Sequence, residues 1–381
     1  MGAGPLLFRT ACRRAEGEGV RSRYHTRAKL GIADEIRTRR MLYRVIDRSE
    51  LPSLVSAFME TYEVVAPVKS GLSYAFEVVS SFQEIELDYP TTITSLKKYY
   101  LPPRETLFKF DAASNEVVPY TEKVKPRVIF GAHACDINAL NCLDSVFEDV
   151  RYPDPYYEAR KSATMIVGIS CMPSEGCFCH LLDSDEARNG YDLFLQDIGD
   201  RYLVSIGSVE AANILEASCN PREATDEDRI AFRQVTRHRQ ESFNPDIPDI
   251  QEIPMLMDAF HSDPFWEELG SRCLSCTACS SVCPTCYCFD ICDVLDPDGK
   301  TGKRDRVWDA CTSPQFAEVA GGHNFRADGR GRVRHRMYHK LNGFLSTHNR
   351  NLCVGCGRCV YACKANISPI EVLKFFERKG A

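Results

Sequence analysis

The fold of this chain is decided by the stretch Cys273-Leu-Ser-Cys276-Thr-Ala-Cys279-Ser-Ser-Val-Cys283-Pro284, whose spacing is repeated in Cys353-Val-Gly-Cys356-Gly-Arg-Cys359-Val-Tyr-Ala-Cys363. Both runs follow C-x₂-C-x₂-C-x₃-C, a spacing typical of cysteines that ligate paired 4Fe–4S clusters. Because three thiolates on a tight loop hold three irons of one cluster, the fourth thiolate points away toward a second cluster. The sequence therefore predicts two clusters with crossed ligands: Cys273, Cys276, Cys279 and Cys363 for cluster 1, and Cys283, Cys353, Cys356 and Cys359 for cluster 2.

Two alternatives to this crossed ligation stay open at the level of sequence. Zinc sites use paired C-x₂-C knuckles rather than two complete four-cysteine runs, so the spacing favours iron–sulfur. The second run begins 80 residues after the first, and Lys364 stands where a proline is usual. If the long insertion separates the runs, each cluster takes its fourth ligand locally. Gly355 and Gly357 allow the backbone of the second run to fold closely around the sulfurs.

The composition indicates a folded protein with metal-binding thiols. Of its 381 residues, 44% are hydrophobic and 26% are charged, and the net charge is −6. These values exclude a disordered chain and a strongly basic nucleic-acid-binding protein, and no run approaches the roughly 18 apolar residues of a membrane helix. Twelve of the 19 cysteines lie in residues 273–381, a density typical of metal ligands in a chain without a secretory signal. We interpret residues 1–37 as a flexible basic leader.

Residues 38–250 are predicted to form an α/β (α+β) domain. Apolar runs at 127–130 and 163–170 flank an amphipathic helix that starts near Asp136. A strand–helix–strand unit of this length favours a right-handed crossover and parallel strands, whose carboxyl ends meet at one sheet edge. We therefore expect Cys135 and Cys171 to be neighbours there. With two thiols of the adjoining loop they are candidates for a third cluster, and buried or redox-active thiols are the alternative. The four candidates are Cys135, Cys171, Cys177 and Cys179.

Residues 251–381 are predicted to form a dicluster ferredoxin-like, largely helical domain with a basic insertion at 293–350. Residues 300–350 contain 11 Lys and Arg against 4 Asp and Glu. Alternating arginines would share one face of a strand, and that face is a candidate docking surface for an acidic partner, with a solvated basic surface as the alternative. These arginines are Arg330, Arg332, Arg334 and Arg336. Four further cysteines are interpreted as buried small side chains or as groups packed around the clusters: Cys286, Cys288, Cys292 and Cys311.

Segments between residues 95 and 370 resemble a known family. They are 101–108 (LPPRETLF), 134–136, Cys171 with 177–179, 192–193, 283–289 (CPTCYCF), 308–311 (WDAC), 320–326 (AGGHNFR) and 353–363. The family comprises the iron–sulfur electron-transfer subunit of anaerobic sulfite reductase and the beta subunit of soluble sulfhydrogenases, which are NAD(P)-linked nickel–iron hydrogenases. Where the family has Arg-Pro-Cys-Asp, this sequence has His133-Ala134-Cys135-Asp136, which leaves the thiol in place.

The resemblance implies a cytoplasmic electron-transfer subunit with 4Fe–4S clusters and no catalytic residue of its own. Such a subunit relays electrons between a flavin subunit that handles NAD(P)H and a separate catalytic subunit of nickel–iron hydrogenase or siroheme sulfite reductase type. In agreement, the sequence contains neither G-x-G-x-x-G nor G-x-x-x-x-G-K-[ST], the commonest nucleotide-binding loops. One alternative is an iron–sulfur enzyme that reduces a small substrate or a disulfide at the sheet-edge thiols. Another, a redox sensor that binds nucleic acid, is disfavoured by the acidic net charge.

Overall fold

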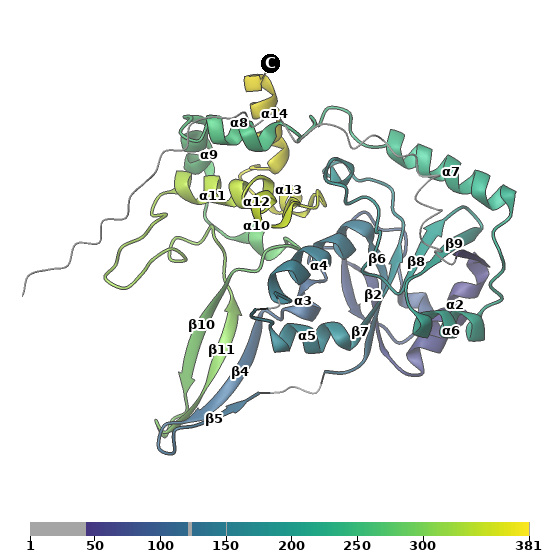
Figure 1. Cartoon of the computed structure of the whole chain (residues 1–381), viewed down its shortest axis with the longest axis horizontal. Coiled ribbons are helices and arrows are strands. Elements are labelled where there is room, and N and C mark those ends of the chain that lie inside the picture. Colours follow the sequence, from purple (N-terminus) through teal and green to yellow (C-terminus); the bar gives the residue numbers. More distant parts are fainter. Residues whose placement is uncertain (1–42, 121–123, 150, 381) are drawn as a thin grey trace, which may run out of the picture. The chain divides into compact units, whose positions relative to one another are not determined.

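A seven-stranded sheet forms the centre of the first half of the chain (Figure 1). Its strand order is β1-β9-β8-β7-β6-β2-β3, in which β2, β6, β7 and β8 run parallel and the outer strands pair antiparallel. The computed structural model describes residues 43–120, 124–149 and 151–380. The strands of this sheet are β1 Tyr43–Asp47, β2 Glu63–Ser70, β3 Ser73–Val78, β6 Arg127–His133, β7 Thr164–Ile169, β8 Leu193–Asp197 and β9 Arg201–Ile206.

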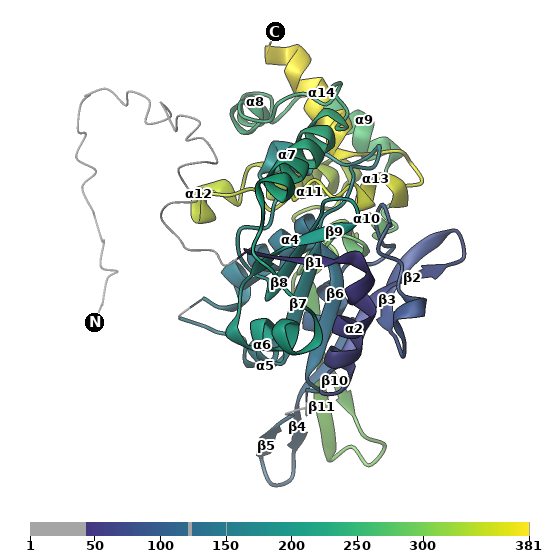
Figure 2. The ribbon, with the colours of Figure 1, turned by 90° about the vertical axis from the view of Figure 1, so that its right-hand side faces the viewer.

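Helices cover both faces of this sheet (Figures 1 and 2). In β6, Val128 and Phe130 pack in the core that contains α2 and α6, whereas Ile129 packs with α4 on the other face. Because successive strand residues point to opposite faces, the continuous apolar run of β6 corresponds to a strand buried on both sides. The expected parallel pairing of the strands in 127–170 is confirmed. The helices are α2 Leu51–Met59, α3 Lys97–Tyr100, α4 Ala134–Phe147, α5 Pro155–Ser162 and α6 Val209–Ser218.

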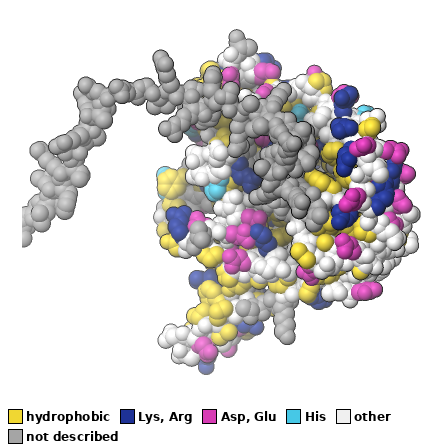
Figure 3. All heavy atoms as spheres, turned by 45° about the vertical axis from the view of Figure 1, so that its right-hand side comes forward, with side chains coloured by type: hydrophobic (Ala, Val, Ile, Leu, Met, Phe, Trp, Pro, Cys, Tyr) yellow, Lys and Arg dark blue, Asp and Glu magenta, His cyan; other side chains and the backbone are white. Residues whose placement is uncertain are grey.

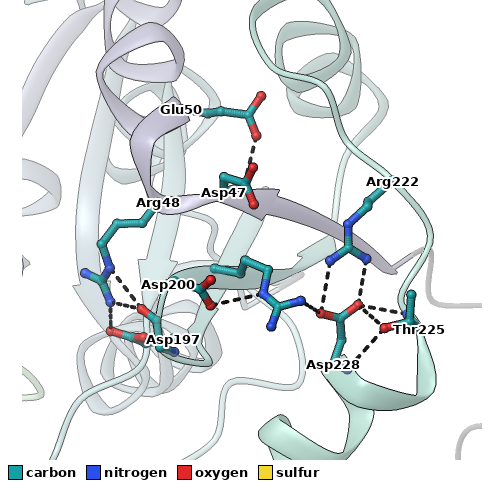
Figure 4. Close-up of polar contacts among 10 residues, drawn as sticks. Asp47, Arg48, Glu50, Asp197, Asp200, Arg222, Thr225 and Asp228 are labelled. Carbon is teal, nitrogen blue, oxygen red and sulfur yellow. Dashed lines mark hydrogen bonds and ion pairs between the residues drawn. The ribbon is translucent and has the colours of Figure 1, made fainter.

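A buried carboxylate fixes the long helix α7 (Asp226–Glu241) to the strand β9. The Asp228 side chain has no exposed surface, and it accepts hydrogen bonds from Arg201 Nη1 of β9 at 2.8 Å and from Arg222 Nη1 at 2.6 Å. Thr225 caps the first turn of the helix, and its hydroxyl also donates to Asp228 (Figure 4). Charge-assisted hydrogen bonds of this kind are stronger than neutral ones, so they hold the helix against the sheet.

A second, antiparallel sheet joins distant parts of the sequence, with the strand order β10-β11-β4-β5. Its central strands are linked by a buried group of charges in which Glu105 lies between Arg306 and Arg160. The outer part of the sheet projects at the bottom of Figure 3 and carries exposed hydrophobic side chains, among them Val117 and Val118. Residues on the two sides of position 250 therefore share one sheet. Its strands are β4 Arg104–Asp111, β5 Glu116–Pro119, β10 Phe289–Leu295 and β11 Thr301–Trp308.

The last third of the chain combines helices with the β10–β11 hairpin, so that the whole structure is a mixed α/β fold. Its core contains Met257, Trp266 and Phe376, each without exposed surface. None of the helices that the structure describes is both long and apolar enough to pass through a lipid bilayer. The helices are α8 Ile253–Ala259, α9 Phe265–Arg272, α10 Ala278–Ser281, α11 Gly329–Leu341, α12 Leu345–His348, α13 Arg358–Ala362 and α14 Pro369–Gly380.

Short 3-10 turns at Arg48–Glu50, Phe82–Glu84 and Cys179–Leu182 complete the regular elements among the described residues. All of the described residues belong to one compact unit, residues 42–381. The basic leader expected at 1–37 lies outside the described residues.

Candidate iron–sulfur centres

The carboxyl ends of β6 and β7 bring two of the predicted thiols to one edge of the central sheet. β6 ends at His133 and α4 begins directly after it, which places Cys135 in the first turn of α4. β7 pairs with β6 as far as Ile169, and Cys171 follows two residues later. The two cysteines therefore lie at the same sheet edge, as the strand–helix–strand pattern predicts.

All four candidate thiols of this edge line one cavity, together with Cys356 of the second cysteine run. The sulfurs of Cys177 and Cys179 lie 3.3 Å apart. Burial raises the pKa of the Cys135 thiol, and it raises the pKa of Cys171 to about 12. These two thiols are therefore protonated at neutral pH without a metal, and a metal that binds them as thiolates releases their protons.

The loop that carries Cys177 and Cys179 packs directly against the second cysteine run. The Phe178 N–H donates to the Gly355 carbonyl at 2.8 Å. Gly355 and Gly357 have φ values of 63° and 75°, and a Cβ on Gly355 would lie 2.5 Å from the Cys179 backbone nitrogen. Only glycine fits a backbone with this conformation and this neighbour. The Gly355 N–H lies 3.5 Å from the Cys353 sulfur, and the same glycine also approaches the sheet-edge loop, which the sequence does not predict.

A buried ion pair joins the same two regions. Arg358 Nη2 lies 2.8 Å from Asp136 Oδ2, and the two side chains are only 2% and 0% exposed. Arg358 also donates to the carbonyl and the hydroxyl of Thr92. Since Asp136 follows Cys135 and Arg358 precedes Cys359, the ion pair fixes the sheet-edge thiols relative to the second cysteine run.

A second cavity gathers the residues predicted to ligate cluster 2. It is lined by thiols of both cysteine runs and by two buried cations, Arg336 and Lys340. This set fits a 4Fe–4S cluster, because thiols converge from two segments and positive side chains offset the negative charge of the thiolates. The lining thiols are Cys283, Cys353, Cys356 and Cys359.

The two cysteine runs share one backbone conformation. Ser275 and Thr277 of the first run correspond in spacing to Gly355 and Gly357 of the second, and they have left-handed φ values of 53° and 63°. Such values are uncommon for residues other than glycine. The short helices that follow the two loops, α10 and α13, pack together. The internal repeat of the sequence is therefore also a repeat of the structure.

The residues predicted to ligate cluster 1 are less enclosed. Cys273 and Cys363 pack against the core around Trp266, whereas Cys276 is exposed. The Ile367 N–H donates to the Cys363 sulfur at 3.3 Å. Within the described ranges, no group of three His, Cys, Asp or Glu side chains is arranged to hold a single metal ion. A 4Fe–4S cluster does not require such convergence, because each thiolate holds a different iron.

The basic stretch at 330–336 belongs to the helix α11, and the expectation of a strand with one shared arginine face is wrong. Residues four apart, not two apart, share a helix face. Arg332 and Arg336 are accordingly buried, and Arg336 Nη2 donates to the Cys279 carbonyl at 2.8 Å. Arg330 and Arg334 are half-buried and contact the region of α8 and α9 instead.

Buried cations lie beside the cysteines, and the sequence does not predict them. Lys340, one helical turn after Arg336, donates to Thr285 Oγ1 at 2.8 Å and interacts electrostatically with Cys283. The spacing 332, 336 and 340 is the signal that could have shown this basic helix face. The burial of Lys97 and the pairing of Arg358 with a distant carboxylate have no comparable signal, because both depend on contacts between remote segments.

Comparison with known proteins agrees with this site. A 4Fe–4S dicluster domain matches residues 272–367. The chain is 37% identical over 334 residues to sulfhydrogenase 2 subunit beta of Pyrococcus furiosus, and the alignment covers 87% of this chain and 98% of that protein. No solved structure shows a significant match. With this identity over nearly the whole relative, the chain belongs to the sulfhydrogenase beta-subunit family.

Proposed function

We propose that this chain relays electrons between a flavin subunit that handles NAD(P)H and a separate catalytic subunit of nickel–iron hydrogenase type. Its family and its dicluster domain support an electron-transfer role. When bound, 4Fe–4S clusters supply one-electron transfer. The proposed ligands are Cys273, Cys276, Cys279 and Cys363 for cluster 1, and Cys283, Cys353, Cys356 and Cys359 for cluster 2.

The observation that carries this proposal is that the two thiol-lined cavities meet at Cys356, which lines both. The Cys356 side chain therefore lies beside both thiol sets, between the second run and the edge of the central sheet. Leu352 and Val354, which are 0% and 3% exposed, pack with the sheet-edge thiols. These buried apolar side chains shield the sheet-edge thiols from water, which favours an enclosed relay.

At the sheet edge we propose a third 4Fe–4S cluster. The four thiols line one cavity at this edge, and a bound cluster would take them as thiolates, with release of the protons that Cys135 and Cys171 carry without a metal. The loop contact at Gly355 and the ion pair of Arg358 with Asp136 hold this edge beside the second cysteine run. The proposed ligands are Cys135, Cys171, Cys177 and Cys179.

Iron analysis of the full-length, anaerobically purified chain tests the third cluster. Cys177→Ser should remove about four irons per chain, the content of one 4Fe–4S cluster. The matched control is Cys219→Ser, which alters a buried cysteine in the core with α2 and α6. Equal iron contents in the two variants would contradict the third cluster while leaving the two crossed sets untouched.

Anaerobic purification of the native protein tests the relay. We expect a flavin subunit and a nickel–iron subunit to co-purify, and we expect NAD(P)H to reduce this chain only when the flavin subunit is present. A siroheme subunit in place of the nickel–iron subunit would assign the chain to a sulfite reductase. Steady reduction of a small substrate or a disulfide by the isolated chain would contradict the relay and favour an enzyme with its site at the sheet-edge thiols.

A further inference from the structure

A histidine in the cavity at the sheet edge has a ring nitrogen without a partner. His133 is the last residue of β6, two residues before Cys135, and it lines the same cavity as the four sheet-edge thiols. It is 2% exposed, and its Nε2 atom has no hydrogen-bond partner among the described residues. Buried polar atoms are nearly always hydrogen-bonded, because burial without a hydrogen bond is unfavourable. The cavity therefore contains a polar group that a bound ligand can satisfy.

Stacking fixes the plane of the His133 ring. The ring lies on that of Tyr89, with centroids 4.0 Å apart and an angle of 12° between the planes. Tyr89 is itself buried, and its hydroxyl donates to the Gly131 carbonyl at 2.7 Å, so the tyrosine is fixed as well. Stacking covers one face of the imidazole and leaves its nitrogens, which lie at the ring edge, free to form hydrogen bonds.

A bulge in β6 sets the orientation of its last residues. The pairing of β6 with β7 shifts by one residue at Gly131, which has a φ value of 84°. Ala132 accordingly packs in the same core as Ile129, although strict alternation would place it with Phe130. Bulges are frequent next to functional sites, where they re-aim a side chain. The bulge at Gly131 therefore determines the direction in which His133 leaves the strand.

An imidazole is suited to donate a hydrogen bond to sulfur. A neutral imidazole carries one N–H donor, and the thiolates and sulfides of an iron–sulfur cluster are acceptors. Hydrogen bonds to the sulfurs are among the factors that set the reduction potential of such a cluster. Because reduction adds negative charge, a donor stabilises the reduced cluster more than the oxidised one. A donor beside the sheet-edge thiols would therefore raise the potential of a cluster bound there.

We propose that His133 donates a hydrogen bond from Nε2 to a sulfur of the sheet-edge cluster and thereby raises the reduction potential of that cluster. This inference rests on the third cluster proposed above. His133 is not an iron ligand in this arrangement, because the four thiols supply one ligand for each of the four irons. Its role is to tune the cluster through the sulfurs.

Redox titration of the full-length, anaerobically purified chain, followed by electron paramagnetic resonance, tests this role. The signal of the sheet-edge cluster is the one that Cys177→Ser removes. His133→Met should make this cluster about tenfold harder to reduce, which lowers its midpoint potential by about 59 mV for one electron. His133→Gln keeps an N–H donor and should retain most of the original potential. The matched control is His238→Met, which replaces an exposed histidine of α7 and should leave the potential unchanged.

The same titration separates the role of His133 from the existence of the cluster. If Cys177→Ser removes neither a signal nor iron, the third cluster is overturned, and the role of His133 is overturned with it. If the signal is present but His133→Met has the same potential as the His238→Met control, only the role of His133 is overturned. The third cluster then stands, and the unpartnered nitrogen binds water only.

A measurement on the unaltered sequence covers the case in which His133→Met does not fold or loses iron. The full-length chain is labelled with ¹⁵N at histidine only, and pulsed electron paramagnetic resonance is recorded on the reduced signal that Cys177→Ser removes. We expect a coupling between this signal and a histidine nitrogen, and we expect the coupling to disappear in His133→Gln. Absence of a histidine coupling in the labelled chain, or an equal coupling in His133→Gln, overturns the proposal.

Discussion

The contact between α7 and β9 and the cavity lined by Cys283, Cys353, Cys356 and Cys359 both bury charge, but they neutralise it in different ways. Asp228 of α7 has no exposed surface and is paired with Arg201 of β9 and with Arg222 (Figure 4). In the cavity lined by the four thiols, Arg336 and Lys340 are buried, and neither is paired with a carboxylate of the described residues. The first arrangement is electrically complete within the chain. The second requires negative charge, which metal-bound thiolates supply.

Removal of iron should have the largest effect and should separate these two regions. Because metal binding is coupled to folding in sites of this kind, the two cysteine runs should lose protection against amide hydrogen exchange when iron is removed by oxidation and chelation. The segment around Asp228 should keep its protection, since its charges are paired within the protein. Hydrogen exchange followed by mass spectrometry measures both regions in one sample, and reduced protein with chelator alone is the control. Equal loss of protection in both regions would show that the cysteine runs depend on bound metal no more than the segment around Asp228 does.

Arg358→Met tests the buried arginine–carboxylate pair that lies next to the thiols. The substitution leaves Asp136 as an uncompensated buried charge, and we expect the free energy of unfolding to fall by about 3–5 kcal/mol. Guanidinium titration under anaerobic conditions, followed by circular dichroism, measures the change.

Two further variants sharpen the interpretation of Arg358→Met. Arg334→Met removes a half-buried arginine of α11 and should cost much less. Combining Asp136→Asn with Arg358→Met should recover part of the loss, because no unpaired charge then remains buried. If Arg358→Met is as mild as Arg334→Met, the ion pair does not hold the sheet edge to the second cysteine run.

The features that follow from the sequence are those whose signals lie within a short segment. The spacing of the two cysteine runs predicts 4Fe–4S ligation, and the dicluster domain at 272–367 agrees with that interpretation. The apolar runs around α4 predict parallel strands, and β6 and β7 pair in this way. That pairing alone is sufficient to place Cys135 and Cys171 at one sheet edge.

The features that the sequence does not reveal are contacts between remote segments. The strands β4 and β11 pair although Glu105 and Arg306 are 201 residues apart, and Arg358 and Asp136 are 222 residues apart. No periodicity within one segment specifies the distant segment against which it packs. The stretch 330–336 shows a different difficulty, since its alternating arginines fit a strand face, whereas the buried side chains follow the helical spacing of α11.

Asp228→Asn should have an intermediate effect with a defined pH dependence. Hydrogen bonds from Arg222 lower the pKa of Asp228. A carboxylate with a lower pKa in the folded state stabilises the protein fully above its unfolded pKa, near 3.9, and the effect is lost as the pH falls through the folded pKa. We expect a loss of about 1–3 kcal/mol that is constant from pH 8 to pH 5 and shrinks only below about pH 4.

Thermal unfolding across this pH range measures the effect of Asp228→Asn. Asp226→Asn is the matched control, because the Asp226 side chain is in the first turn of the same helix and is 92% exposed. The control should have little effect at any pH. A difference between Asp228→Asn and the original chain that grows below pH 4 would contradict the assigned direction of the pKa shift.

Substitution of Arg330 and Arg334 on α11 should give the smallest effect on stability, and it tests whether this basic helix has a second role. Arg330 pairs with the exposed Glu267 and Arg334 donates to the His261 carbonyl, so their joint reversal to Glu should lower the free energy of unfolding by about 1 kcal/mol. If this side docks an acidic partner, the same variant weakens association with a partner subunit, most at low ionic strength, where screening is weakest. Arg233→Glu, on an exposed position of α7, is the matched control in binding measurements at two salt concentrations. Association equal to that of the control at both concentrations would leave α11 with only its inward role, in which Arg336 lies against the thiols.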